Sequence, residues 1–249
     1  MRALTVTVSP RLPVGGASPH GGRVQSVNGD DDVARCAPGW WSGPTATHRL
    51  GDHAVLVPVK AFAHAKRRLT AALCDDDRRA LVRRMAEQVL RAAAPFPVAV
   101  VCDDPEVAAW ARGHHALVLW EPGRGLNGAV QSGVAQLAAR GVRRVVVAHA
   151  DLPMARDLPR LAGFDGVTLV PDRRDDGTNV IELSTGAGFR FSYGPGSFAR
   201  HLAECERLAL AVRVVREPLL SYDVDWPSDL SEPVLAEDGD QHAYRWTRR

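Results

Sequence analysis

Short, continuously apolar runs alternate with amphipathic stretches between residues 53 and 232. Such runs predict buried strands, and they occur at 54–60, 98–104, 116–122 and 145–150. The stretches between them predict helices. In the first of these, Leu81, Met85 and Val89 repeat every four residues, and arginines occupy the other face. Strands and helices of this length in alternation predict a parallel sheet with helices on both of its faces.

After residue 151 strands and helices no longer alternate regularly. Further strands are predicted at 166–172, 179–184, 189–194, 210–215 and 219–225. The polar links between the first three of these strands are short, which indicates that neighbouring strands here run antiparallel. A helix is predicted from about Ser197, as its cap, to Leu208, and a last helix opens at Pro227. We therefore expect a Rossmann-like, three-layer α/β/α domain with a mixed, mainly parallel sheet.

The two ends of the chain have a different composition. Residues 1–52 are dense in Gly, Pro, Ser and Asp and show neither a helical nor a strand period, which predicts a mostly disordered extension. Trp40 and Trp41 are exceptions, and we interpret them as incidental. The expected organisation is this extension, one folded domain over 53–232, and a polar tail over 233–249.

The composition and net charge of the chain exclude several classes of protein. A chain of 249 residues that is 45% hydrophobic and 24% charged can bury one substantial core. A net charge of +2 is too small to indicate a nucleic-acid partner. Four scattered cysteines without a CxxC pair indicate neither a disulfide framework nor a structural metal site. These cysteines indicate a reducing, cytoplasmic setting. No apolar run is long enough for a membrane span, so we expect a soluble protein.

Two acidic residues follow predicted strands. Asp151 comes directly after the run 145–150, where open α/β sheets bind their ligands, although an ordinary capping Asp gives the same pattern. Asp223 and Asp225 alternate on the last predicted strand, so Asp225 is expected to face the site and Asp223 to point away. If Asp225 lies beside Asp151, the two carboxylates suit Mg²⁺. The alternative for Asp225 is a helix cap before Pro227.

Basic residues follow the first strand. Lys60, Lys66, Arg67 and Arg68 are placed to hold a polyphosphate, because Lys supplies a mobile point charge and Arg can bind in a bidentate manner. The alternative is a solvated basic turn, which is common.

Two glycine-rich stretches each precede a helix. GRGLNG, at 123–128, fits a dinucleotide-binding pattern, but it follows the third strand instead of the first, so a flexible loop is an equal alternative. SYGPGSFARH, at 192–201, predicts free backbone N–H groups at a helix start, which form an anion site. Arg200 and His201 in its first turn oppose the helix dipole, which favours a role as ligands for an anion.

Six segments in this order resemble the 2-phospho-L-lactate guanylyltransferases of deazaflavin coenzyme F-420 biosynthesis, a family that includes phosphoenolpyruvate-using members. They are VPVKAFAHAKRRL, GLNGAVQSG, HADLP, PDRRDDGTNV, FSYGPGSFARH and DVDWPSDL. The resemblance covers about residues 54–232 and implies the fold of nucleotide-sugar pyrophosphorylases and A-type glycosyltransferases. The chain departs from the family in its long amino-terminal extension and in RRDD before Gly177.

The resemblance also implies roles for individual residues. Asp151 and Asp225 would hold Mg²⁺ and, with Lys60, form the catalytic set. The nucleotide would be bound by five residues: Lys60, Lys66 and Arg68 at the triphosphate, and Asn127 and Gly128 at the guanosine. The small phospho-acid would contact Thr178, Gly194 and Ser197. His149 and His201 are interpreted as structural.

The implied reaction transfers GMP from GTP to the phosphate of phosphoenolpyruvate or 2-phospho-L-lactate and releases pyrophosphate. A phosphate nucleophile is largely ionised near neutral pH, since its second pKa is about 6, so no general base is needed. A downstream transferase that accepts the unstable product is a further expected partner. Two alternatives stay open here, namely another nucleotidyltransferase of the nucleotide-sugar or molybdopterin type and a non-catalytic dinucleotide-binding module.

Overall fold

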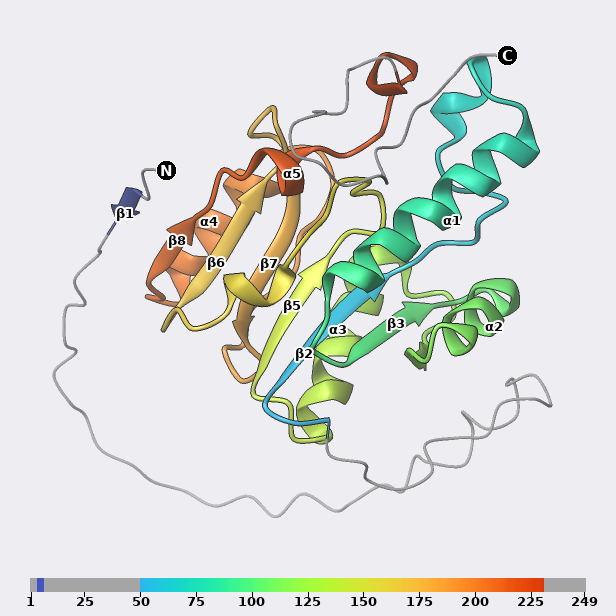
Figure 1. Ribbon diagram of the computed structural model, residues 1–249. Coiled ribbons are helices and arrows are strands. Elements are labelled where there is room, and N and C mark those ends of the chain that lie inside the picture. The colour runs from blue at the N-terminus through green and yellow to red at the C-terminus, as the bar shows by residue number, and fades with distance from the viewer. Residues whose placement is uncertain (1–3, 7–49, 231–249) are drawn as a thin grey trace, which may run out of the picture. The chain divides into compact units, whose positions relative to one another are not determined.

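An eight-stranded sheet runs through the computed structural model, which describes residues 4–6 and 50–230 (Figure 1). Across the sheet, the strand order is β1-β8-β6-β7-β5-β2-β3-β4. The strands are β1 (Leu4–Val6), β2 (His53–Pro58), β3 (Val98–Cys102), β4 (Leu117–Trp120), β5 (Arg144–Ala148), β6 (Val167–Pro171), β7 (Thr178–Ser184) and β8 (Val212–Val214).

The sheet is mixed but mainly parallel, as predicted. Strands β5, β2, β3 and β4 are parallel neighbours, whereas β7 runs antiparallel to both β5 and β6. The chain passes from β2 outward to β3 and β4 and then returns to β5 on the other side of β2. The carboxyl ends of β2 and β5 therefore form a topological switch point, where open α/β sheets bind ligands.

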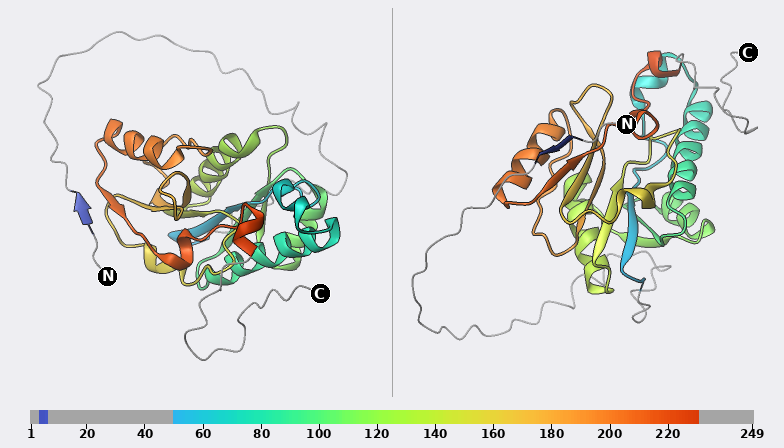
Figure 2. Two further views of the ribbon diagram at one scale, coloured as in Figure 1. Left: turned by 90° about the horizontal axis from the view of Figure 1, so that it is seen from above. Right: turned by 60° about the vertical axis from the view of Figure 1, so that its left-hand side comes forward.

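Helices cover both faces of the sheet (Figure 2). Buried side chains of α1 (Asp75–Ala92), α2 (Pro105–Gly113) and α5 (Pro218–Ser221) share one hydrophobic core with one face of the sheet. Buried side chains of α3 (Gly125–Ala139) and α4 (Ser197–Arg207) share a second core with the opposite face. The described residues also contain the short 3-10 helices η2 (Arg67–Ala71), η3 (Leu158–Leu161) and η4 (Pro227–Leu230).

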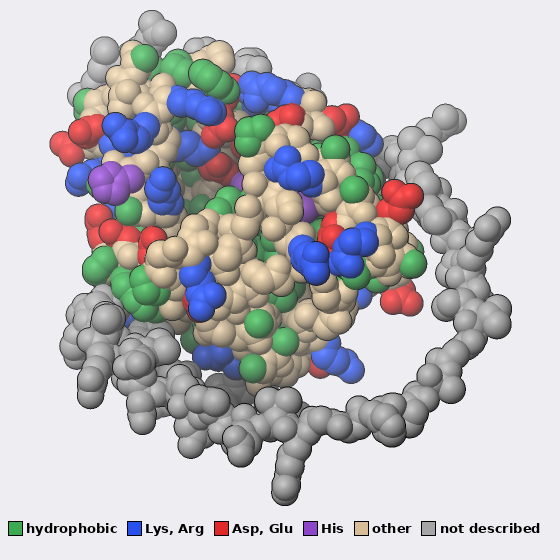
Figure 3. All heavy atoms as spheres, turned by 180° about the vertical axis from the view of Figure 1, so that it is seen from behind, with side chains coloured by type: hydrophobic (Ala, Val, Ile, Leu, Met, Phe, Trp, Pro, Cys, Tyr) green, Lys and Arg blue, Asp and Glu red, His purple; other side chains and the backbone are tan. Residues whose placement is uncertain are grey.

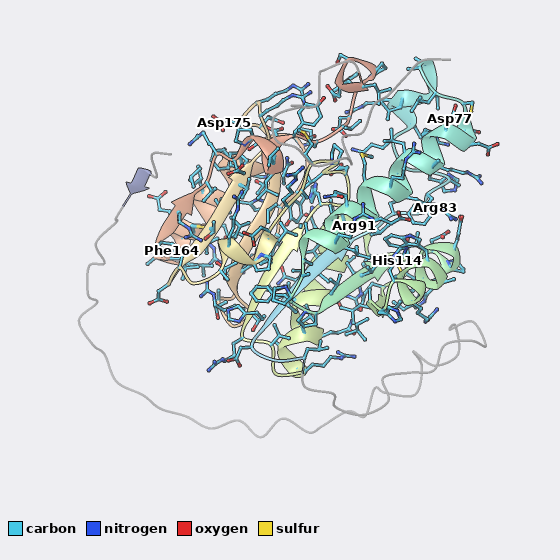
Figure 4. The ribbon with its side chains drawn as sticks, in the orientation of Figure 1. Asp77, Arg83, Arg91, His114, Phe164 and Asp175 are labelled. Atoms are coloured by element: carbon cyan, nitrogen blue, oxygen red, sulfur yellow. The ribbon has the colours of Figure 1, made fainter. Side chains whose placement is uncertain are left out.

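Helix α1 places its predicted apolar stripe in the core, since Leu81, Met85 and Val89 are all buried. Its N-cap is Cys74, and the acidic residues 75–77 occupy the first turn, where their charges favour the helix dipole. On the outer side of α1, Arg83 pairs with Glu106 of α2 (Figure 4). No helix among residues 50–230 is long and apolar enough to cross a membrane.

The segment 189–194 was expected to be a strand, and this prediction was wrong. It is extended but joins no ladder, because side chains of α3 and α4 take its backbone N–H groups. Asn127 and Gln131 of α3 accept from Tyr193 and Phe191, while His201 and Glu204 of α4 accept from Ser192 and Arg190. The segment therefore joins the two helices on this face of the sheet.

One other expectation was wrong. The stretch 219–225 is not a strand but the short helix α5 followed by irregular backbone. In the extension expected to be mostly disordered, the described residues Leu4–Val6 form the edge strand β1, which pairs with β8. Trp40, Trp41 and the tail from 233 lie outside the described residues.

A buried ion pair links the antiparallel part of the sheet. Glu182 of β7 is fully buried, and it accepts from the Arg144 guanidinium at 2.5 and 3.0 Å. The preceding residue, Arg143, pairs instead with Asp52 at the surface. The two neighbouring arginines thus offer a matched comparison of a buried and an exposed pair.

We expect Arg144→Leu to lower the free energy of unfolding by about 3 kcal/mol, because it leaves the Glu182 carboxylate buried without its counter-ion. Urea denaturation measures this change. Arg143→Leu should cost less than about 0.5 kcal/mol. The double variant Arg144→Leu/Glu182→Leu should recover most of the loss, and equal losses for the two arginine variants would contradict this account.

Candidate functional site

The candidate site lies where the loop after β2 meets the loop after β5. These strands pair in parallel with Leu56 opposite Val147, so both loops leave the same edge of the sheet. The first loop carries Lys66, and the second carries Asp151. Seen from behind, acidic and basic side chains lie close together around a hollow in the upper part of the molecule (Figure 3).

The Lys66 ammonium lies between two carboxylates. It donates to Oδ2 of Asp151 at 2.5 Å and to Oδ1 of Asp225, and the Lys66 side chain is only 13% exposed. Burial works against the ammonium, but the two carboxylates outweigh it and raise the pKa of Lys66. Burial likewise opposes the Asp151 carboxylate, and the charge of Lys66 outweighs it, so the pKa of Asp151 is lowered. The predicted meeting of Asp151 and Asp225 is confirmed.

Arg78 holds the loop that carries Lys66. From the buried face of α1, its guanidinium donates to the carbonyls of Phe62, Ala63 and Ala65, and it also pairs with Asp75. Arg78 was not among the residues predicted for the site. Its signal was a single arginine on the apolar face of α1, where a charged side chain stays only if it finds polar partners.

Asp229 holds the backbone that carries Asp225. Its buried carboxylate accepts from the N–H groups of Asp225 and Trp226, both at 2.8 Å, and its other oxygen pairs with Arg173. Val224 in turn donates its N–H to the carbonyl of Asp151. Asp229, which was also missed, therefore fixes Asp225 beside Asp151.

Asp223 interacts electrostatically with Asp151 and Asp225, although it was expected to point away from the site. That expectation assumed strand alternation, but residues 222–225 form no strand. Asp223 is buried, and burial followed by the charges of Asp151 and Asp225 raises its pKa to about 6. One oxygen of Asp223 and one of Asp151 are buried without a hydrogen-bond partner. Negative charge at the site thus exceeds what Lys66 neutralises.

The three residues expected to bind the small acid lie together at the start of α4. Thr178 is buried and contacts Nδ1 of His201 at 3.0 Å, and the Gly194 carbonyl accepts from the N–H of Ser197. Gly196, not Ser197, is the N-cap of α4, because its φ of 70° suits glycine. Ser197 is instead the first helical residue.

The N–H groups at this helix start are not free, contrary to prediction. The Asp176 side chain accepts from Gly196, and the Asp176 carbonyl accepts from Phe198, both at 3.0 Å. Asp172 folds the loop 172–177 back by accepting from three of its N–H groups. The acidic residues that depart from the family pattern therefore occupy part of the expected anion site.

Arg200 and His201 contact backbone groups of the segment 192–195, and their role as anion ligands stays a prediction. The Arg200 guanidinium donates to the carbonyls of Ser192, Gly194 and Pro195. Nε2 of His201 accepts from Ser192, and burial, reinforced by Arg200, lowers the pKa of His201 to about 4. Burial also lowers the pKa of His149. Both imidazoles are neutral near pH 7, as their structural interpretation requires.

The other predicted nucleotide ligands lie around this cluster. Lys60 is exposed at the end of the β2 region, and Arg68 lies over the ring of Trp226, with its guanidinium 4.0 Å from Asp225. Asn127 is already engaged, since its amide bonds to both the N–H and the carbonyl of Tyr193. Its contact with guanosine stays a prediction, as does that of Gly128, which lies in the first turn of α3.

The sequence of this chain is similar to those of known proteins. A family model described as "Guanylyl transferase CofC like" matches residues 53–249. The phosphoenolpyruvate guanylyltransferase of Sphaerobacter thermophilus is 37% identical over 186 residues, which span 71% of this chain and 90% of that protein. The 2-phospho-L-lactate guanylyltransferase of Methanothermobacter thermautotrophicus is 31% identical over 202 residues, 78% of this chain and 89% of that protein.

Solved structures show the same fold. A putative nucleotide-diphospho-sugar transferase from Desulfovibrio desulfuricans superimposes with a TM-score of 0.59 at 18% identity, over 72% of this chain and 84% of that one. The predicted nucleotide-sugar transferase-like architecture is confirmed by this likeness and by the mixed sheet with two helical layers.

We expect Asp223→Asn to raise the free energy of unfolding at pH 7 by about 2–3 kcal/mol. In the folded protein the ionised form of Asp223 is disfavoured. The resulting loss in the free energy of unfolding therefore grows as pH rises from 3.8, the ordinary pKa of the carboxyl group, through about 6. Denaturant titrations at pH 4 and 7, in the presence of a chelator, measure the free energy of unfolding of the wild-type and variant chains. The stability gained by Asp223→Asn should vanish near pH 4. Asp151→Asn should instead destabilise at pH 7, and a destabilised Asp223→Asn variant would contradict the assignment.

Proposed function

The chain belongs to the family of CofC-like guanylyl transferases and is a nucleotidyltransferase, and from this premise we propose that it guanylylates a small phospho-acid. GTP is the donor. A phosphate oxygen of the acid forms a bond to the α-phosphorus as the bond to the β-phosphate oxygen breaks, so GMP is transferred and pyrophosphate leaves. Asp151, Lys66 and Asp225 at the switch point are the observation that carries this proposal.

The residues around the site are suited to this chemistry because it needs no general base. A phosphate monoester has a second pKa of about 6, so the nucleophile is largely ionised near neutral pH. What the reaction requires is positioning and charge neutralisation of several anions. Lys66 and Arg68 supply positive charge beside the carboxylates, and Lys60 does so from the exposed end of the same loop.

The donor set fits Mg²⁺, which we propose as the cofactor. Asp151 and Asp225 offer carboxylate oxygens, and a buried oxygen of Asp151 has no protein partner. Within residues 50–230, no group of three or more His, Cys, Asp or Glu residues forms a cage for a metal ion. Mg²⁺ is suited to such a site, because it uses one or two carboxylates together with waters and substrate phosphates. When bound, it would neutralise charge on the transferred and leaving phosphates.

For the acceptor we propose phosphoenolpyruvate, with 2-phospho-L-lactate as the close alternative. The relatives in Sphaerobacter thermophilus and Conexibacter woesei, at 37% and 38% identity, are named for phosphoenolpyruvate. Thr178, Gly194 and Ser197 would hold the acid, which requires Asp176 to release the N–H of Gly196. The buried ring of Phe191 nearby disfavours an unpaired hydroxyl by about 1–3 kcal/mol.

The cell compartment and a partner complete the proposal. The three described cysteines, Cys74, Cys102 and Cys205, are free, which supports a reducing cytoplasmic setting. A downstream transferase would consume the guanylylated product, whose phosphoanhydride bond is reactive.

A pyrophosphate-release assay tests the reaction directly. GTP should support turnover with phosphoenolpyruvate or 2-phospho-L-lactate, and 3-phosphoglycerate should react more slowly because of its hydroxyl. Mass spectrometry identifies the products when the acids compete at equal concentration. Exclusive consumption of 3-phosphoglycerate would overturn the pocket argument, and absence of turnover with every acid would overturn the proposed reaction.

Asp151→Asn and Asp225→Asn should each lower kcat/KM by about 100-fold or more, since each removes a charged oxygen donor from the site. Asp103→Asn is a matched control, because Asp103 is exposed and follows β3 at the same edge of the sheet. It should change kcat/KM by less than about threefold. Full activity in a folded Asp225→Asn variant would show that the carboxylate pair is not the catalytic centre.

A further inference from the structure

The Lys66 ammonium and a divalent cation need the same oxygens. Lys66 donates to Oδ2 of Asp151 and Oδ1 of Asp225, and its side chain is only 13% exposed. A cation bound to both carboxylates would lie within a few ångströms of this ammonium. Like charges at that separation repel strongly in a site of low dielectric. The two cations therefore exclude each other at this position.

The site nevertheless attracts a further cation. Three carboxylates, those of Asp151, Asp223 and Asp225, interact here with two cations, the Lys66 ammonium and the Arg68 guanidinium 4.0 Å from Asp225, so one negative charge is left over. Oδ1 of Asp151 and Oδ1 of Asp223 are buried without a partner. Buried polar atoms of this kind cost free energy unless a ligand satisfies them. The carboxylates thus favour a divalent cation, provided that the ammonium has another anion to contact.

Lys66 can move without its loop moving. Arg78 fixes the backbone of this loop through the carbonyls of Phe62, Ala63 and Ala65. Lys66 itself has a φ of 52°, a left-handed conformation that a lysine adopts at a small energetic cost. Its ammonium sits on a flexible four-carbon stem and can shift by side-chain rotation alone. A bound triphosphate would give it a new partner within reach of the same anchor point.

We propose that Lys66 is the resident counter-ion of the metal-binding carboxylates and that it exchanges places with the metal when the nucleotide binds. The ammonium passes from Asp151 and Asp225 to the triphosphate, while the divalent cation takes the carboxylates. The identity of the triphosphate rests on the proposed function. The consequence is that the carboxylates bind a free divalent cation weakly and accept the metal together with the nucleotide.

The exchange is tested by titrating the protein with Mn²⁺ alone. The electron paramagnetic resonance signal of free Mn²⁺ reports how much of the metal is bound. Lys66→Met should bind Mn²⁺ about tenfold tighter than the wild-type chain without nucleotide, because the competing charge is gone. Lys60→Met removes the same charge from an exposed position of the same loop and should change the affinity by less than about threefold. An affinity of Lys66→Met equal to or below that of the wild-type chain would overturn the proposal.

A second measurement uses the unaltered protein and so does not depend on the variant's folding. Acylation of lysines, located by mass spectrometry, should be slow at Lys66 and fast at the exposed Lys60 without metal. Saturating Mn²⁺ alone should speed the acylation of Lys66 several-fold relative to Lys60. An unchanged ratio of the two rates would exclude displacement of the ammonium.

The pyrophosphate-release assay on the wild-type chain separates this proposal from the proposed function. Tighter Mn²⁺ binding by Lys66→Met together with no guanylyl transfer would support the exchange and overturn the reaction. Guanylyl transfer by the wild-type chain together with unchanged Mn²⁺ binding by Lys66→Met would support the reaction and overturn the exchange.

Discussion

The parallel pairing of β2 with β5 is the constraint on which the site depends. It brings the loop that carries Lys66 next to the loop that carries Asp151, although these residues are 85 positions apart in the chain. Because β3 and β4 lie on the far side of β2, no other strand separates the two loops. The position of Asp225 follows from this pairing, since Val224 bonds to the backbone of Asp151 and Asp229 holds the turn that follows.

Excess negative charge is the second property that organises the site. Lys66 and Arg68 neutralise only part of the charge on Asp151, Asp223 and Asp225, and water has little access to the buried Asp223. The buried Asp223 carboxylate destabilises the folded protein when it is ionised, and a cation bound at the site would recover part of that free energy. Residues that fix the surrounding backbone, such as Arg78 and Asp229, keep the carboxylates in place at this cost.

The opposite side of the site is built from contacts between side chains and backbone. Segment 189–193 is held by Asn127 and Gln131 of α3 and by His201 and Glu204 of α4. These contacts place Gly194 and the start of α4 near Thr178, where Asp176 already occupies two N–H groups. An anionic substrate at this point must therefore compete with a carboxylate of the protein, which makes the loop 172–177 a determinant of affinity for the acid.

The layers of the fold, the order of its strands and helices along the chain and the place of Asp151 after a buried strand could be predicted from the sequence. Apolar runs and helical periodicity are local signals, and Asp151 follows such a run directly. Tertiary structure alone decided that 189–193 joins no ladder, that 222–225 is irregular and that Asp223 interacts with Asp151 and Asp225. It also decided the roles of Arg78, Asp176 and Asp229, because each acts on backbone groups distant from it or across a turn. A side chain's period along the chain predicts which face it shares with its neighbours, whereas its partners depend on which segments the fold brings into contact.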